Sequence, residues 1–181
     1  LTDVKTAEMI RYASNALLAT EISFINSIAN ICEKLGADVK LVAEGMRQDK
    51  RIGKYAFLEA GVGYGGSCFP KDVKALIQIA QENGIRFSIL EAVEATNEAQ
   101  KQSLLVKIQK LIGEDLHEKK IAVWGLAFKP QTDDIREAPS LVVIKQLLDR
   151  GAKITVFDPV ARLKDNDENI VFSDEKKIDC A

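Results

Sequence analysis

Cys68, Lys71 and Asp72 place a thiol, an ammonium and a carboxylate within five residues of one another. Pro70 suits the first turn of a helix, so we expect Cys68 at a helix start. There the helix dipole and the nearby Lys71 both favour the thiolate, which is the nucleophilic form of cysteine. Asp72, four residues beyond Cys68, is expected one turn further on the same side. These residue types indicate covalent catalysis through sulfur.

Two other interpretations of this stretch remain open. A free cysteine is often a small buried hydrophobe, and that would make Cys68 inert. Gly61, Gly63 and Gly66 match a GxGxxG dinucleotide fingerprint, but no strand pattern precedes them and no acidic residue closes a second strand about 20 residues on. We favour a third interpretation, in which the glycine segment (residues 61–66) lets backbone approach a bulky polar ligand and leaves Cys68 uncovered.

Composition narrows the function classes. His117 is the single histidine, which excludes a His-dependent triad and a multi-His metal site, so we expect no metal. Cys32, Cys68 and Cys180 are far apart and form no CxxC pair, which favours a reducing, cytoplasmic location. The 25 basic and 27 acidic residues nearly cancel, so we expect no nucleic-acid partner. No apolar stretch approaches the ~20 residues that span a bilayer, so we expect no membrane partner either.

Helical periodicity dominates the first two thirds of the chain. From Thr6 to Leu35 apolar residues recur at helical spacing, and Gly36 supplies a stop. They extend beyond one narrow stripe, so we expect this helix to pack on two sides and to form a homodimer. Three more helices are predicted: a short helix with Asp38 as N-cap that ends near Gly45, residues 70–83 stopped by Gly84, and residues 88–112 opened by the capping-box pair Ser88 and Glu91.

The last third has a different texture. Residues 120–124 and 153–157 each predict a buried strand, and residues 139–150 between them predict a helix. Strand, helix and strand within about 40 residues form a parallel βαβ unit. We therefore predict an α/β chain, with an all-helical part over 1–115 and the opening of a parallel α/β domain over 116–181. One βαβ unit has exposed edges, so we take the chain as a piece of a longer protein.

Four segments carry ordered motifs: residues 7–16 (AEMIRYASNA), 49–53 (DKRIG), 63–72 (GYGGSCFPKD) and 125–137 (GLAFKPQTDDIRE). Together they resemble the nucleotide-sugar 6-dehydrogenases of the UDP-glucose/GDP-mannose dehydrogenase family, in the UDP-glucose form. The resemblance implies a central helical dimerisation domain followed by a partial Rossmann-like, nucleotide-sugar-binding domain. It also implies oxidation of a sugar C6 alcohol to a carboxylate with two NAD, through a cysteine thiohemiacetal and thioester.

The family's catalytic roles fall on four residues by motif. Cys68 would be the nucleophile, and Asp72 would position or activate water. Asn15 would help to hold the developing oxyanion, as an amide donor suits. Where the family usually places a lysine, four residues before the asparagine, this chain has Arg11. A guanidinium keeps the positive charge but cannot lose a proton, so Arg11 is expected to stabilise anions rather than to transfer protons.

The resemblance also implies ligand contacts. Lys71 would lie near NAD and Arg136 would reach it, while Lys129 would contact the UDP-sugar. Arg51 would cross a dimer interface to the partner's sugar, although the Arg51–Phe57 spacing is one residue longer than usual. The nucleotide sugar would be lined by Phe57, Leu58, Glu59, Ala60, Gly61 and Gly65.

Plainer alternatives stand beside these roles. Arg51 and Asn15 could be solvated polar residues, and Lys129 and Arg136 could flank an ordinary turn. Asp158 could bind ribose or could simply end a strand in a turn. A GDP-mannose dehydrogenase or a non-catalytic dimerisation module are the alternative functions. No strand runs into a true GxGxxG loop, so the NAD-binding domain is expected to be missing and this chain to be inactive alone.

Overall fold

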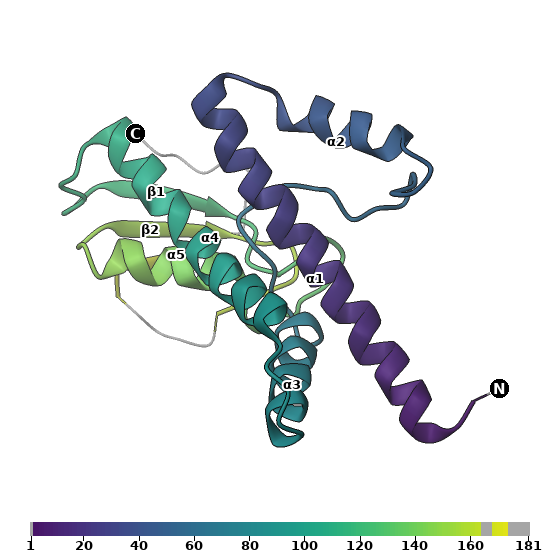
Figure 1. The fold of residues 1–181 in the computed structure, drawn as a ribbon. Helices are drawn as coiled ribbons and strands as arrows, with labels where there is room; N and C mark the ends of the chain where they lie inside the picture. Colours follow the sequence, from purple (N-terminus) through teal and green to yellow (C-terminus); the bar gives the residue numbers. More distant parts are fainter. Residues whose placement is uncertain (1, 164–167, 174–181) are drawn as a thin grey trace. The chain divides into compact units, whose positions relative to one another are not determined.

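The computed structural model describes residues 2–163 and 168–173 and divides the chain into two compact units, residues 1–100 and 101–181. The division falls inside α4 (Ser88–Ile112), a helix that Figure 1 labels, ahead of the change expected near residue 115. The reason is packing, since Leu104 and Leu105 of α4 join the core of the second unit. The two units are described separately below.

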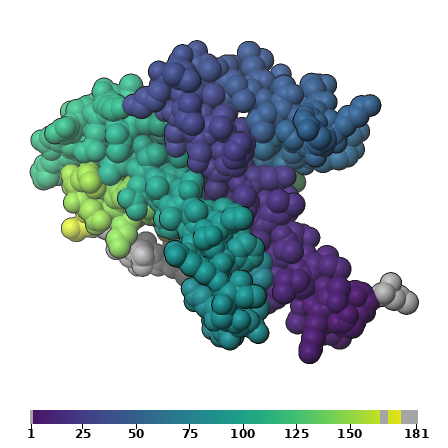
Figure 2. Space-filling view, in the orientation of Figure 1, coloured from purple at the N-terminus to yellow at the C-terminus, as the bar shows by residue number. Residues whose placement is uncertain are grey.

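Helix α1 (Val4–Leu35) is the longest element of the first unit. Asp3 caps its start by accepting the Thr6 N–H at 3.0 Å, so the helix begins two residues before the predicted start. Gly36 ends it with a left-handed φ of 72°, as the sequence predicts. Helix α3 (Phe69–Glu82) packs against α1 (Figure 1), and the two share a core with Tyr64 and the first turns of α4. Much of α1 is visible on the molecular surface in Figure 2.

Two local predictions are wrong. Helix α2 (Val39–Gln48) runs through Gly45, because Ala43 and Met46 on either side pack against Ile25 and Leu58, and that burial offsets the helix cost of glycine. Ser88 lies inside the first turn of α4 instead of capping it. Glu91 does not close a capping box, because its carboxylate pairs with Arg86.

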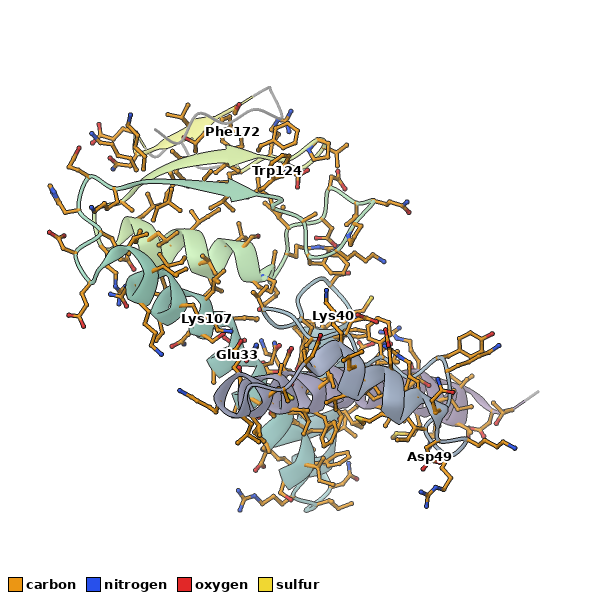
Figure 3. The ribbon with its side chains drawn as sticks, turned by 90° about the horizontal axis from the view of Figure 1, so that it is seen from above. Glu33, Lys40, Asp49, Lys107, Trp124 and Phe172 are labelled. Atoms are coloured by element: carbon orange, nitrogen blue, oxygen red, sulfur yellow. The ribbon has the colours of Figure 1, made fainter. Side chains whose placement is uncertain are left out.

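The second unit holds a three-stranded parallel sheet in the order β1 (Lys120–Trp124), β2 (Lys153–Phe157) and β3 (Ile170–Phe172). Helix α5 (Pro139–Leu148) connects β1 to β2, and Figure 3 shows it on one face of the sheet, with Trp124 and Phe172 marking the strands. Its core joins α5 and the end of α4 to the sheet. A helical part followed by a parallel α/β part confirms the predicted fold class, although β3 was not predicted.

Among the described residues, none of the helices is long and apolar enough to cross a bilayer.

Candidate active site

Cys68 stands at the start of α3 with its thiol exposed. It is the N-cap residue, its carbonyl accepts the Asp72 N–H at 2.8 Å, and its Sγ lies 3.8 Å from the Ser67 hydroxyl. Cys32 is buried on α1, which is the environment of core filler. Cys180 lies outside the described residues. Of the two cysteines described, Cys68 is therefore the one a substrate can reach.

Asp72 lies one turn after Cys68 and is completely buried. Arg11 on α1 donates to both of its oxygens, with Nη2 2.9 Å from Oδ1 and Nε 3.3 Å from Oδ2. Asn15, one turn along α1, donates from Nδ2 to Oδ2 at 2.6 Å, and the Lys71 ammonium lies 3.5 Å from Oδ1. The structure thus brings together the residues expected to be catalytic, with Lys71 beside them.

These contacts set the charge state of the cluster. Burial acts to raise the pKa of Asp72, but hydrogen bonds from Arg11 and Asn15 and the charges of Arg11 and Lys71 outweigh it, so the pKa falls below its ordinary value. The Asp72 hydrogen bond and charge raise the pKa of Arg11, and a charge on Cys68 raises it further. A negative charge on the sulfur therefore lies within the electrostatic reach of the guanidinium.

The segment expected to line the sugar passes from α2 towards Cys68. Phe57 donates its backbone N–H to Glu21 on α1 at 2.8 Å, and its ring meets that of Phe69 edge to face at 6.4 Å. Phe69 meets Tyr64 in the same way at 6.0 Å. Leu58 is buried, whereas Glu59, Ala60 and Gly61 are exposed and Gly65 is buried. The aromatic contacts hold this segment beside the start of α3.

Three amide side chains that the sequence analysis did not single out hold the glycine segment. Asn26 on α1 accepts the Gly61 N–H at 2.7 Å, and Gln100 on α4 donates to the Gly61 carbonyl at 2.7 Å. Asn97 on α4 accepts the Tyr64 N–H at 2.8 Å and donates to the Tyr64 carbonyl at 3.1 Å. All three are buried. Their only signal in the sequence is an amide among apolar helix positions.

The glycine segment lies between α2 and α3, so the element before it is a helix and its context is not that of a dinucleotide-binding loop. It does carry two left-handed glycines, Gly63 and Gly66, with φ of 102° and 84°.

Arg51 and Glu59 form ion pairs with residues outside the Asp72 cluster. Arg51 is exposed and pairs with Asp49 at the end of α2, which Figure 3 labels. Glu59 pairs with Arg47 at 2.8 Å. A small cavity of about 170 Å³ lies between α2 and residues 58–60. The role of Arg51 towards a partner chain stays a prediction.

In the second unit, the loop after β1 carries the other two expected contacts. Lys129 is exposed, with Nζ 5.4 Å from the centre of the Phe128 ring. Arg136 is exposed and pairs with Asp134 at 2.7 Å, and its hydrogen bonds lower the pKa of Asp134 to about 2. Both cations are exposed side chains of the segment between β1 and α5, and their roles towards a ligand stay predictions.

Asp158, at the end of β2, is buried and accepts four backbone N–H groups. Its Oδ2 accepts from Leu126 and Ala127 at 2.8 and 3.3 Å, and its Oδ1 accepts from Val160 and Ala161 at 2.9 and 2.7 Å. The carboxylate is occupied by the backbone, so Asp158 shapes the loop after β1 instead of binding ribose. Within the described residues, no group of three or more His, Cys, Asp or Glu side chains could hold a metal ion.

Comparison with known proteins places this geometry in a family. Residues 5–99 match the model of the UDP-glucose/GDP-mannose dehydrogenase family, central domain, and residues 122–180 match its UDP binding domain. The chain belongs to the UDP-glucose/GDP-mannose dehydrogenase family. The resemblance stated from the four motifs is thereby confirmed.

Individual members of the UDP-glucose/GDP-mannose dehydrogenase family are also similar to this chain. UDP-glucose 6-dehydrogenase YwqF of Bacillus subtilis is 55% identical over 160 residues, which are 88% of this chain and 36% of that relative. The structure of a UDP-glucose dehydrogenase from Pyrobaculum islandicum matches with a TM-score of 0.87 at 38% identity, over 94% of this chain and 40% of that one.

A GDP-mannose dehydrogenase structure from Pseudomonas aeruginosa matches with a TM-score of 0.54 at 32% identity, over 88% of this chain and 36% of that one. The chain therefore spans well under half the length of these relatives.

Proposed function

We propose that this chain supplies the covalent-catalysis part of an NAD-dependent UDP-glucose 6-dehydrogenase, which converts UDP-glucose to UDP-glucuronate. The observation that carries the proposal is the exposed Cys68 thiol one helical turn before Asp72, whose buried carboxylate accepts hydrogen bonds from Arg11 and Asn15. The names of the relatives support UDP-glucose as the substrate, and the weaker structural match to a GDP-mannose dehydrogenase makes GDP-mannose the control.

The reaction removes four electrons from the sugar C6. NAD, when bound, accepts one hydride from the alcohol and a second NAD accepts the next. Between these transfers the Cys68 sulfur adds to the aldehyde carbon and forms a thiohemiacetal, whose oxidation gives a thioester. Water then attacks the thioester carbon, the C–S bond breaks, and the carboxylate leaves as Cys68 regains its thiolate. One alcohol, one water and two NAD yield one carboxylate, two NADH and three protons.

The cluster divides this work. Asn15 uses one Nδ2 hydrogen for Asp72, and the second hydrogen on the same nitrogen is the donor for an oxyanion at C6. Arg11 adds positive charge on the same helix face. The lowered pKa of Asp72 makes it a poor general base, so we assign it to the orientation of Asn15, Arg11 and the attacking water.

NAD fits the chain in part. Lys71 is an exposed cation three residues after Cys68, and its positive charge suits an anionic dinucleotide; for Arg136 the same role rests on the motif. In the part of the chain that the structure describes, no strand runs into a GxGxxG loop. We propose that the main NAD-binding residues belong to another part of the enzyme, and that Lys129 binds the UDP-sugar.

We also propose that the enzyme is a homodimer that forms through α1. Ile10, Leu17, Phe24 and Ile31 are all about half exposed or more and recur every seven residues, as in the apolar seam of a coiled coil. Sedimentation should report a dimer, and Leu17→Glu should yield monomers. Leu111→Glu, at a still more exposed leucine of α4, should leave the dimer intact. Free thiols at Cys32 and Cys68 suit the reducing cytoplasm.

The proposed activity is tested on the natural full-length protein. With UDP-glucose and NAD, absorbance should report two NADH for each UDP-glucuronate, and GDP-mannose should yield little. Cys68→Ser should abolish UDP-glucuronate formation, whereas Cys32→Ser should retain it. UDP-glucuronate formation at the normal rate by Cys68→Ser would refute the proposal.

A further inference from the structure

The glycine segment is held by side chains in place of strand pairing. We use the term amide clamp for Asn26, Asn97 and Gln100, which bond the backbone of Gly61 and Tyr64 from α1 and α4. Both the N–H and the C=O of each of these two backbone residues meet an amide group. This is the pairing that a neighbouring strand would offer, supplied here by two helices to an irregular segment.

Burial of the amide clamp costs free energy, because polar groups lose their hydrogen bonds to water. All three side chains are at most 7% exposed, and the Nδ2 of Asn26 has no hydrogen-bond partner among the described residues. An apolar side chain would fill these helix positions without leaving a buried donor unpaired. The hydrogen bonds to Gly61 and Tyr64 offset this cost and fix the positions of those two backbone residues. Gln100 also accepts a hydrogen bond from Asn30 on α1.

Helix α1 connects the amide clamp to the catalytic cluster. Asn15 and Asn26 are separated by 11 residues, close to three full turns, so they lie on the same face of α1, about 16 Å apart along its axis. Asn15 bonds the Asp72 carboxylate and Asn26 bonds Gly61. One rigid element thus sets both the oxyanion donor and the backbone expected to line the sugar.

We propose that the amide clamp positions residues 57–65 for the nucleotide sugar, so that Asn26, Asn97 and Gln100 are positioning residues of the dehydrogenase reaction. The inference rests on the proposed function for its substrate. The structural part of the inference does not depend on the substrate: the three amides hold the backbone of residues 57–65 in a fixed position relative to Asn15 and Asp72. Loss of one amide should therefore weaken binding of the nucleotide sugar more than it changes the reactivity of the Cys68 thiol.

The first experiment measures amide hydrogen exchange on the natural full-length protein. Asn97→Ala removes the acceptor of the Tyr64 N–H and leaves the acceptor of the Gly61 N–H in place. Exchange at Tyr64 should rise by about tenfold or more, the weight of one lost hydrogen bond, while Gly61 and the middle of α1 stay protected. Unchanged exchange at Tyr64 would overturn the amide clamp, and uniform acceleration would reduce it to a general stability effect.

The second experiment separates positioning from folding. Gln100→Ala should raise the KM for UDP-glucose by about tenfold, with the KM for NAD unchanged. Gln102→Ala is the matched control, because Gln102 is two residues on in the same helix and is exposed. A simple loss of folded enzyme lowers the apparent kcat and leaves KM alone, so that result in Asn97→Ala and Gln100→Ala would overturn the inference.

The two arms also separate this inference from the proposed function. If the unmodified enzyme makes no NADH from UDP-glucose, the proposed function fails, and the positioning role fails with it. The exchange arm needs no substrate, so it still decides whether the amide clamp holds the glycine segment.

Discussion

Arg11 and Asp72 are 61 positions apart in the sequence and meet in a two-point contact, with Nη2 2.9 Å from Oδ1 and Nε 3.3 Å from Oδ2. The contact joins α1 to α3 one turn after Cys68. The carboxylate is fully buried, but the guanidinium side chain is 57% exposed. Arg11 can therefore offer its charge to a ligand while it holds Asp72 in place.

Substitution of Arg11 tests whether the residue acts by charge or by proton transfer. Because a guanidinium stays protonated, we expect Arg11→Lys to leave kcat unchanged or lower it, and Arg11→Met to lower kcat by about 100-fold. Steady-state kinetics at pH 7 measure both. A kcat that rises in Arg11→Lys would contradict the charge role, since it would show that a proton donor is the better residue.

The stability that Asp72 contributes should depend on pH. Its pKa is lowered in the folded chain, so its contribution is fully present above the unfolded pKa of about 3.9 and is lost as the pH falls through the lower folded pKa. Urea unfolding should find Asp72→Asn less stable than the unmodified chain at pH 7, and the gap should narrow below about pH 4. The acids common to both chains cancel in this difference. A gap that stays constant from pH 7 to pH 3 is incompatible with the ion pair.

Asn15 is expected to act on the rate more than on binding. Asn15→Leu removes the donor to Asp72 and the second N–H offered to the oxyanion, so kcat should fall by about 10²–10³-fold. Ser14→Ala, at the neighbouring exposed position, is the control and should retain kcat. An Asn15→Leu enzyme with normal kcat and a raised KM would assign Asn15 to ground-state binding instead.

Alkylation should distinguish the two described cysteines. Cys68 is exposed, whereas Cys32 is only 7% exposed. Iodoacetamide near neutral pH should therefore modify Cys68 at least about tenfold faster than Cys32, because Cys32 reacts only when α1 opens. Peptide mass mapping in a Cys180→Ser background gives the two rates directly. Equal rates would mean that the thiol at the start of α3 is not accessible.

Asp158 should matter for stability rather than for catalysis. Asp158→Ala leaves four backbone N–H groups without their acceptor and should cost about 3 kcal/mol in the free energy of unfolding. Asp158→Asn should cost less, because its carbonyl keeps one of the two N–H pairs. Urea unfolding measures both, with Asp133→Asn as the exposed control. An Asp158→Ala chain as stable as the control would disprove the bracing role.

Periodicity and caps were sufficient to predict most of the elements. The apolar spacing of α1, the Asp38 cap of α2 and the strand run Lys153–Phe157 all appear where the sequence places them. Gly45 misled because packing around Met46 outweighs a local preference. The three residues of β3 were missed because so short an apolar run has no period of its own, and only pairing with β2 makes it a strand.

The candidate site was predictable only in part. Cys68, Lys71 and Asp72 are close in sequence, so their grouping needs no tertiary information, and the motif supplied Arg11 and Asn15. Asn26, Asn97 and Gln100 carried no such signal, because a helix sequence does not say which of its amides faces a distant backbone. The outcome for Asp158 also depended on tertiary contacts, since only the fold directs the four N–H groups to its carboxylate.

The shared face of Asn15 and Asn26 restricts how α1 can change in length. One residue inserted or deleted between them would rotate one amide about 100° around the helix relative to the other, so either the Asp72 contact or the Gly61 contact would be lost. Whole-turn changes would keep the rotation but shift the spacing by about 5.4 Å per turn. A substitution at an exposed position of this stretch leaves both contacts in register, whereas the insertion or deletion of one residue does not.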